Sequence, residues 1–122
     1  MINIPQISES ELEVMKVIWE LGSVTSSQIV EQLKKTTDWK PKTIQTLITR
    51  LVSKEAIEVD KCNKKLYIYF PKINEEEYKT FVSTSFIERL YNGSVNMMIA
   101  SFIKNKKMSE DDIKELKNLL EE

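Results

Sequence analysis

Apolar residues recur every three or four positions through the first half of the chain, which is the period of a helix that buries one face. Three such stripes are present. They consist of Leu12, Met15, Ile18 and Trp19; of Ile29, Val30 and Leu33; and of Ile44, Leu47, Ile48 and Leu51. Two helices followed after a turn by a third with a polar outer face form the pattern of a helix-turn-helix.

Residues with strong positional preferences mark the ends of these helices. Ser8-x-x-Glu11 and Thr25-x-x-Gln28 are capping boxes that open the first two helices. Gly22 is expected to end the first helix in the left-handed conformation. Pro41 suits the first position of the third helix, which makes Lys40 its cap.

The period changes from 3.6 to 2 after the third helix, which predicts extended strands. Residues 57–61 and 66–70 form two such runs, and the four residues between them contain Lys64 and Lys65. Pro71 is expected to end the second run. A β-hairpin that directly follows a helix-turn-helix is the wing of a winged helix, and here its tip is basic.

Three further helices are predicted after the hairpin. The first opens with the acidic residues 74–77 and ends at Asn92-Gly93, the second runs from about Val95 to Lys104, and the third begins at the capping box Ser109–Asp112. Their apolar residues are Tyr78, Phe81, Val82, Phe86 and Leu90; Val95, Met98, Ile99, Phe102 and Ile103; and Ile113, Leu116, Leu119 and Leu120.

The predicted fold is mainly helical with a small β wing. A winged helix-turn-helix domain covers residues 1–71 and a three-helix domain covers residues 72–122. A domain of this size cannot cover all three C-terminal stripes, so pairing of two identical chains is expected. The predicted dimer interface consists of Phe86, Leu90, Met98, Ile99, Phe102, Ile113, Leu116 and Leu120. The alternative is a monomer whose C-terminal helices wrap the N-terminal domain.

The outer face of the third helix carries hydroxyl and basic side chains and no carboxylate. Its threonines at 43, 46 and 49 are poor choices for helix stability. Short hydroxyl side chains beside an arginine do, however, suit phosphate and base-edge contacts. The expected DNA-binding residues are Lys40, Lys42, Thr43, Gln45, Thr46, Arg50, Lys64 and Lys65. The alternatives are a solvated amphipathic helix and a winged-helix module that binds only protein.

Composition restricts the class of protein. Within 122 residues there is no apolar run of about 18, as a membrane span requires, and no signal-peptide pattern, so a cytoplasmic location is expected. One cysteine, Cys62, rules out a disulfide within the chain, and the absence of histidine argues against a zinc or copper site. Because a glycine-rich loop is also missing, neither an enzyme nor a cofactor is expected.

The net charge of −1 conceals an uneven distribution of charge. Residues 34–65 carry nine basic and four acidic side chains, a net charge of +5, whereas residues 1–33 carry −4 and residues 66–122 carry −2. Contacts with phosphate are screened beyond about 8 Å at physiological salt, so the local charge matters more than the total. The basic third of the chain contains the threonine-rich helix and the wing.

Three runs of residues resemble the BlaI/MecI penicillinase-repressor family. They are Ser8-x-x-Glu11 leading into Val14-Met15-x-x-Ile18-Trp19; Trp39-x-Pro41-Lys42-Thr43-Ile44-x-Thr46-Leu47-Ile48-Thr49-Arg50-Leu51; and Ile99-x-x-Phe102. The resemblance covers essentially the whole chain, and its second run is far more specific than a generic helix-turn-helix. It implies a homodimeric winged-helix repressor that binds palindromic operators with a TACA/TGTA core and controls β-lactamase or related resistance genes.

The resemblance also implies induction by proteolysis. In this family a membrane-bound β-lactam sensor with a zinc protease domain leads to cleavage of the repressor in its dimerisation domain. The cleaved bond joins asparagine to phenylalanine, and the matching bond here is Ser101–Phe102. Members closest to the β-lactam system have arginine where this chain has Gln45, and the copper-responsive branch has a C-terminal cysteine cluster that is missing here. A repressor of the same family with a different signal is therefore the alternative.

Overall fold

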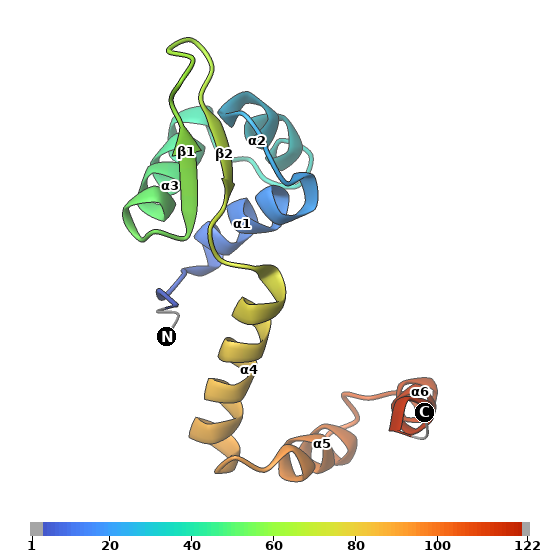
Figure 1. Ribbon diagram of the computed structural model, residues 1–122. Helices are drawn as coiled ribbons and strands as arrows, with labels where there is room; N and C mark the ends of the chain where they lie inside the picture. Colours follow the sequence, from blue (N-terminus) through green and yellow to red (C-terminus); the bar gives the residue numbers. More distant parts are fainter. Residues whose placement is uncertain (1–3, 121–122) are drawn as a thin grey trace. The chain divides into compact units, whose positions relative to one another are not determined.

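The computed structural model describes residues 4–120, which form six helices and two strands (Figure 1). In chain order these are α1 (Glu9–Leu21), α2 (Ser26–Leu33), α3 (Pro41–Ser53), β1 (Ile57–Asp60), β2 (Ile68–Pro71), α4 (Glu75–Tyr91), α5 (Val95–Lys104) and α6 (Glu110–Leu120). The chain divides into an N-terminal unit that ends at Lys79 and a C-terminal unit that begins at Thr80. The mainly helical fold with a small sheet agrees with the prediction.

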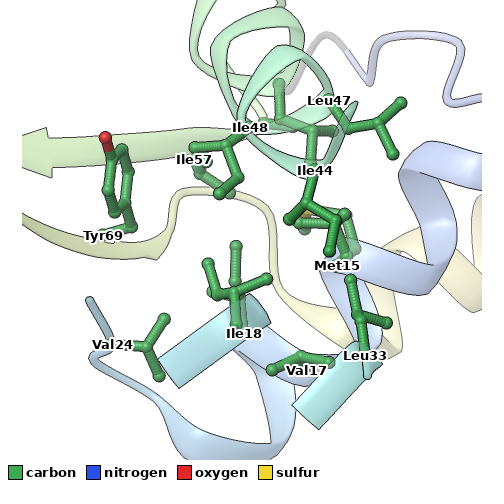
Figure 2. Close-up of a cluster of buried hydrophobic side chains, with 14 of the residues drawn as sticks. Met15, Val17, Ile18, Val24, Leu33, Ile44, Leu47, Ile48, Ile57 and Tyr69 are labelled. Atoms are coloured by element: carbon green, nitrogen blue, oxygen red, sulfur yellow. The ribbon is translucent and has the colours of Figure 1, made fainter. Parts of the chain in front are cut away.

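The core of the N-terminal unit lies where α1, α2 and α3 meet the hairpin (Figure 2). Met15 and Ile18 of α1 and Ile44 and Ile48 of α3 have no exposed surface. Full burial of one such side chain is worth roughly 1.5–3 kcal/mol, so these residues are the main stabilising contacts of the unit. The predicted stripes thus share one core, and this fixes which face of α3 points outward.

The ends of α1 follow the predicted residues, with one difference in geometry. Ser8 and Glu11 form the expected capping box, because the Glu11 backbone N–H donates to Ser8 Oγ and the Ser8 N–H donates to Glu11 Oε1. Gly22 has the expected positive φ of 84°, but its ψ of −66° is not that of a left-handed helical residue. The Ser23 N–H donates to the Leu21 carbonyl at 3.1 Å, so Gly22 is the centre of a γ-turn.

The hairpin is antiparallel, with Ile57 opposite Pro71 and Asp60 opposite Ile68. Its strands are shorter and shifted relative to the prediction, since residues 61, 66 and 67 lie outside them and Pro71 lies inside. The cause is at the tip, where the Asp60 carboxylate accepts the backbone N–H of Cys62 at 2.9 Å. Side-chain bonds of this kind replace ladder bonds and end a strand early.

An isolated antiparallel β-bridge between Val24 and Tyr69, which the sequence did not predict, adds a third segment to the sheet. The Val24 N–H donates to the Tyr69 carbonyl at 2.9 Å, and the Tyr69 N–H donates to the Val24 carbonyl at 2.7 Å. Val24 immediately precedes the cap of α2. The pair therefore joins the helix-turn-helix to the hairpin through backbone bonds as well as through the core.

The segment that follows β2 makes close contacts with the rest of the N-terminal unit. The backbone N–H groups of Lys72 and Ile73 both donate to the Ala56 carbonyl, at 3.0 and 3.2 Å. The Ile73 carbonyl accepts from Trp19 Nε1 at 2.8 Å, and the Tyr78 ring lies 5.6 Å from the Trp19 ring. These contacts explain why the unit extends to Lys79, whereas the sequence places the change of architecture near Pro71.

The helices of the C-terminal unit begin and end close to the predicted residues. α4 ends before Asn92 and Gly93, which both have positive φ. α5 has the predicted bounds, and the expected capping box opens α6, with Asp112 Oδ2 accepting the Ser109 N–H at 3.1 Å. No helix among residues 4–120 is long and apolar enough to cross a membrane.

Candidate nucleic-acid interface

The two faces of α3 have opposite characters. Ile44, Leu47, Ile48 and Leu51 are buried, as predicted. The exposed side chains are Lys42, Thr43, Gln45, Thr46, Thr49 and Arg50. At 1.5 Å per residue, the backbone from Thr43 to Arg50 spans about 10 Å, which is close to the roughly 12 Å width of the DNA major groove. The exposed face, hereafter the reading face, is thus of a size and polarity that suit a nucleic-acid groove.

Two of the three threonine hydroxyls of the reading face are oriented by the helix itself. Thr46 Oγ1 donates to the Lys42 carbonyl, and Thr49 Oγ1 donates to the Gln45 carbonyl, both at 3.0 Å. Each hydroxyl proton is therefore used inside the helix, while the oxygen lone pairs and the methyl group remain free for a ligand. A surface of methyl groups and acceptors can pack against thymine methyls and accept from base amino groups.

The N-terminal end of α3 offers backbone donors beside two lysines. Lys40 occupies the cap position with an extended backbone, and its side chain makes no capping hydrogen bond. Pro41 follows at the first helical position and has no N–H of its own. Among the described residues, no side chain caps the other backbone N–H groups of the first turn. Because Lys40 and Lys42 are both exposed here, this end of the helix suits a phosphate group.

The wing tip holds its lysines at the apex of an ordered turn. The Leu66 N–H donates to the Asn63 carbonyl at 3.1 Å, which makes Lys64 and Lys65 the two central residues. Asn63 Oδ1 also accepts the Lys65 N–H at 2.9 Å. Figure 1 shows this tip projecting beyond the helices of the N-terminal unit. Both lysines are exposed, as a contact with phosphate requires.

Lys61 is a third lysine at the wing tip. It is not among the predicted DNA-binding residues, because the alternating pattern of residues 57–61 predicts that it lies in a strand. Lys61 Nζ lies 5.6 Å from the centre of the Tyr67 ring, so its charge is held near the tip. The hydrogen bond between the neighbouring Cys62 thiol and Asp60 raises the pKa of the thiol, and the Asp60 charge adds to this effect.

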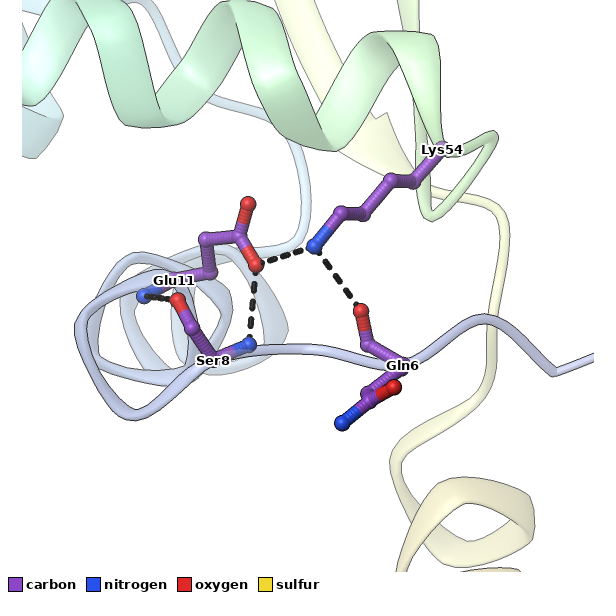
Figure 3. Close-up of polar contacts among 4 residues, drawn as sticks. All are labelled: Gln6, Ser8, Glu11 and Lys54. Atoms are coloured by element: carbon purple, nitrogen blue, oxygen red, sulfur yellow. Dashed lines mark hydrogen bonds and ion pairs between the residues drawn. The ribbon is translucent and has the colours of Figure 1, made fainter.

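An unpredicted ion pair ties the C-terminal end of α3 to α1 (Figure 3). Lys54 Nζ lies 2.6 Å from Glu11 Oε1 and donates to the Gln6 carbonyl at 2.8 Å. The Glu11 side chain is only 2% exposed. Burial raises the pKa of this carboxyl, but the hydrogen bonds from Lys54 and Ser8 outweigh burial and lower it overall.

The sequence did contain a sign of this ion pair. Glu11 precedes Val14, Met15 and Ile18 by three, four and seven positions, so it lies in phase with the buried stripe of α1. A carboxylate in such a position requires a partner, because an unpaired buried charge is costly. A lysine directly after α3, the helix that packs on α1, was the available partner.

The predicted residues of the C-terminal unit differ in exposure. Leu90 is 62% and Phe102 is 37% exposed. Those that are half-buried within one chain are Phe86, Met98, Ile99, Ile113 and Leu116. The side chain of Leu120 lies outside the described residues. Ser101 lies inside α5, and its carbonyl accepts from the backbone N–H of Asn105 at 3.0 Å and from Asn105 Nδ2 at 2.8 Å. The Ser101–Phe102 bond is thus part of a regular helix.

Comparison with known proteins agrees with this architecture. The penicillinase repressor of Bacillus licheniformis is 44% identical over 122 residues, which cover all of this chain and 94% of that protein. The methicillin resistance regulatory protein MecI of Mammaliicoccus sciuri is 38% identical over 115 residues, covering 94% of this chain and 93% of that protein.

One similar solved structure is the solution structure of the monomeric form of Bacillus licheniformis BlaI in complex with the blaP half-operator. It is 46% identical, superposes with a TM-score of 0.55, and covers 64% of this chain and 94% of that chain. The N-terminal unit is therefore a winged helix. The family model described as penicillinase repressor matches residues 7–122. The chain belongs to the penicillinase repressor family.

Proposed function

We propose that this protein is a homodimeric transcriptional repressor that binds palindromic operator DNA with a TACA/TGTA-type core. The reading face of α3 enters the major groove, and the wing tip lies against the flanking phosphates. The observation that carries the proposal is an exposed helical face of three threonines, two cations and one glutamine without a carboxylate. The structure in which a similar protein is bound to a half-operator adds support.

Each part of the proposed interface has its own role. Thr43 and Thr46 contact base edges through their methyl groups and acceptor oxygens, and Arg50 donates to guanine in bidentate fashion. Lys40, Lys42, Lys64 and Lys65 bind phosphates and supply most of the salt-dependent affinity. The family resemblance implies arginine at the position of Gln45 in members of the β-lactam system, and on that expectation the preferred operator differs from theirs at the base pair that this residue faces.

The experiment that tests DNA binding compares two duplexes of equal length and base composition. One contains an inverted TACA/TGTA repeat and the other contains the same bases shuffled. At physiological salt the purified chain is expected to bind the repeat at least about 10³-fold more tightly, the lower limit for a specific protein–DNA complex. Equal affinity for the two duplexes at every salt concentration would refute the proposal.

Dimerisation is proposed because one chain leaves much apolar surface of its C-terminal unit in water. The exposed fractions are 49% for Phe81, 62% for Leu90, 49% for Val95, 53% for Met97, 43% for Ile103 and 66% for Leu119. No residue of α5 is buried. A second copy covers such a surface and at the same time supplies the second reading face that a palindrome requires.

The regulated genes and the inducing signal are also part of the proposal. We infer that the protein represses β-lactamase or related resistance genes in the cytoplasm, as the names of its relatives suggest. Induction is by cleavage at Ser101–Phe102 under the control of a membrane-bound sensor protease. Because this bond lies in a helix, α5 must unfold locally before a protease can bind it.

One residue favours a second candidate, in which the repressor responds to a signal other than proteolysis. The family resemblance implies asparagine before the cleaved bond, whereas this chain has Ser101 there. Exposure of cells to a β-lactam, followed by mass spectrometry of the repressor, separates the two candidates. A new C-terminus at Ser101 supports proteolysis, whereas derepression with an intact chain supports a different signal.

A further inference from the structure

Two helix ends of opposite polarity meet at the Glu11–Lys54 ion pair (Figure 3). Glu11 is the third residue of α1, where a negative charge is favourable, and Lys54 is the C-cap of α3, where a positive charge is favourable. Lys54 also donates to the Gln6 carbonyl at 2.8 Å, so the segment before α1 is tied to the same point. One ammonium group therefore joins three parts of the N-terminal unit.

This junction lies one helical turn from the arginine of the reading face. The Lys54 backbone N–H donates to the Arg50 carbonyl at 2.9 Å, which places the two residues on successive turns of α3. The opposite end of α3 is fixed differently, because Trp39 packs against the hydrophobic core just before the helix begins. Lys54 is thus the polar anchor of the end that carries Arg50.

The ammonium group of Lys54 already has two protein acceptors at short distances. Its carboxylate partner is buried, and leaving that carboxylate unpaired is costly. Although the Lys54 side chain is 36% exposed, these contacts direct its ammonium group to Glu11 and Gln6 within the same unit. The contribution of Lys54 to DNA recognition is accordingly indirect.

We propose that Glu11 and Lys54 are positioning residues that set how the Arg50 end of α3 lies in the DNA groove, and so determine base specificity at that end. The inference rests on the proposed function. Its physical basis is the narrow range of hydrogen-bond geometry: N–H···O distances span about 0.5 Å, and the bond weakens steeply when its angle falls. A small rotation of α3 is enough to break a bidentate contact made by Arg50.

The test measures base preference along the operator for several variants. Affinities are determined for a set of duplexes that each carry one changed base pair, and Arg50→Ala identifies the pair that Arg50 reads. Lys54→Met and Glu11→Gln are both expected to lower the preference at that pair about tenfold, within the range of one lost bidentate contact. The preference at the pair nearest Thr43 should change less than about twofold.

Lys16→Met is the matched control, since Lys16 forms an exposed ion pair with Glu13 on the surface of α1. It should leave every base preference unchanged. Glu11→Gln is the decisive variant because it keeps the Lys54 charge and the size of the side chain. If Lys54 only binds a phosphate, Glu11→Gln will leave the preferences unchanged and Lys54→Met will weaken all duplexes equally, which overturns the inference.

Folding and the proposed function are checked separately from the inference. Circular dichroism at the binding temperature shows whether each variant is folded. If Lys54→Met is unfolded, Glu11→Gln alone decides whether the ion pair positions Arg50. Failure of the unmodified protein to prefer the operator over shuffled DNA refutes the proposed function. A normal operator preference that Glu11→Gln leaves intact at every base pair refutes only the positioning role.

Discussion

The side chains on the exposed face of α3 are better suited to contacts with DNA than to stabilising a helix. Threonine is less favourable than alanine, glutamate or lysine inside a helix, yet the reading face contains three of them. Thr46 and Thr49 donate to backbone carbonyls, which leaves methyl groups and acceptor oxygens for a ligand. Arg50 is the residue of this face with the strongest capacity to discriminate one base from another.

The first prediction concerns Arg50. Arg50→Ala is expected to reduce the preference for operator over random DNA by about 1–3 kcal/mol, because it removes a bidentate contact with a base. Fluorescence anisotropy with both duplexes measures this difference. Arg89→Ala, which changes the other arginine of the chain, is the control. Equal loss of affinity for operator and random DNA would contradict the role given to Arg50.

A second prediction at this scale concerns pH and Glu11. Its pKa is lowered in the folded protein from the ordinary value of 4.5, because the bonds from Lys54 and Ser8 outweigh the effect of burial. The carboxylate therefore adds stability above about pH 4.5, and this contribution disappears as the pH falls through the lower pKa of the folded state.

Urea unfolding between pH 3 and pH 7 measures this contribution. Near neutral pH, Glu11→Gln is expected to lower the free energy of unfolding by about 1–3 kcal/mol, because hydrogen bonds to a charged group are lost. The difference between the two proteins should shrink towards acid pH. Parallel stability curves across the whole range would show that the ionised carboxylate has no stabilising role.

At the scale of secondary structure, local patterns predicted the helices better than the hairpin. Ser8, Thr25 and Ser109 mark helix starts because a cap depends only on neighbouring backbone groups. The strand ends were wrong because the Asp60 side chain competes with the ladder at the wing tip. The pairing of Val24 with Tyr69 joins distant residues, and no local pattern announces such a contact.

The interface was predictable in part for the same reason. The outward face of α3 follows from the phase of its buried stripe, so the exposure of its polar residues could be deduced. The Glu11–Lys54 pair depends on how α1 packs on α3. Only the unusual phase of Glu11 pointed to it, and its partner lies 43 positions further along the chain.

The wing gives the prediction at the scale of an element. Lys64 lies at the apex of the turn with its charge exposed, and the proposal places it against a phosphate. Lys64→Ala should weaken binding to operator and random DNA alike and reduce the slope of log affinity against log salt by about one. Titrations at several salt concentrations measure the slope, with Lys16→Ala as control. A loss restricted to the operator would mean that the wing reads sequence.

For the whole molecule, the proposed self-association connects the C-terminal unit to DNA recognition. A single reading face contacts only a few base pairs, whereas two faces related by a two-fold axis read both halves of a palindrome. The proposed pairing would also cover Leu90, which is 62% exposed in one chain, and its apolar neighbours. Stability of the C-terminal unit and affinity for the operator should therefore both depend on protein concentration.

Leu90 provides the test of this connection. Leu90→Asp is expected to weaken the dimer by about 3 kcal/mol or more, because symmetry places the change twice in one apolar interface. Sedimentation velocity measures the dissociation, and affinity for a half-operator should stay unchanged. Thr84→Asp adds the same charge at an exposed polar position of α4 and is the control. A fully dimeric Leu90→Asp variant would place the interface elsewhere.

The central claim, that paired reading faces recognise an inverted repeat, is tested most directly by hydroxyl-radical footprinting of the DNA upstream of the protein's own gene. We expect two protected segments related by two-fold symmetry, with centres about one helical turn or a multiple of it apart. Protection should disappear with Arg50→Ala at concentrations where the unmodified protein saturates the site. A uniform cleavage pattern without any protected inverted repeat, even at low salt, would contradict the account.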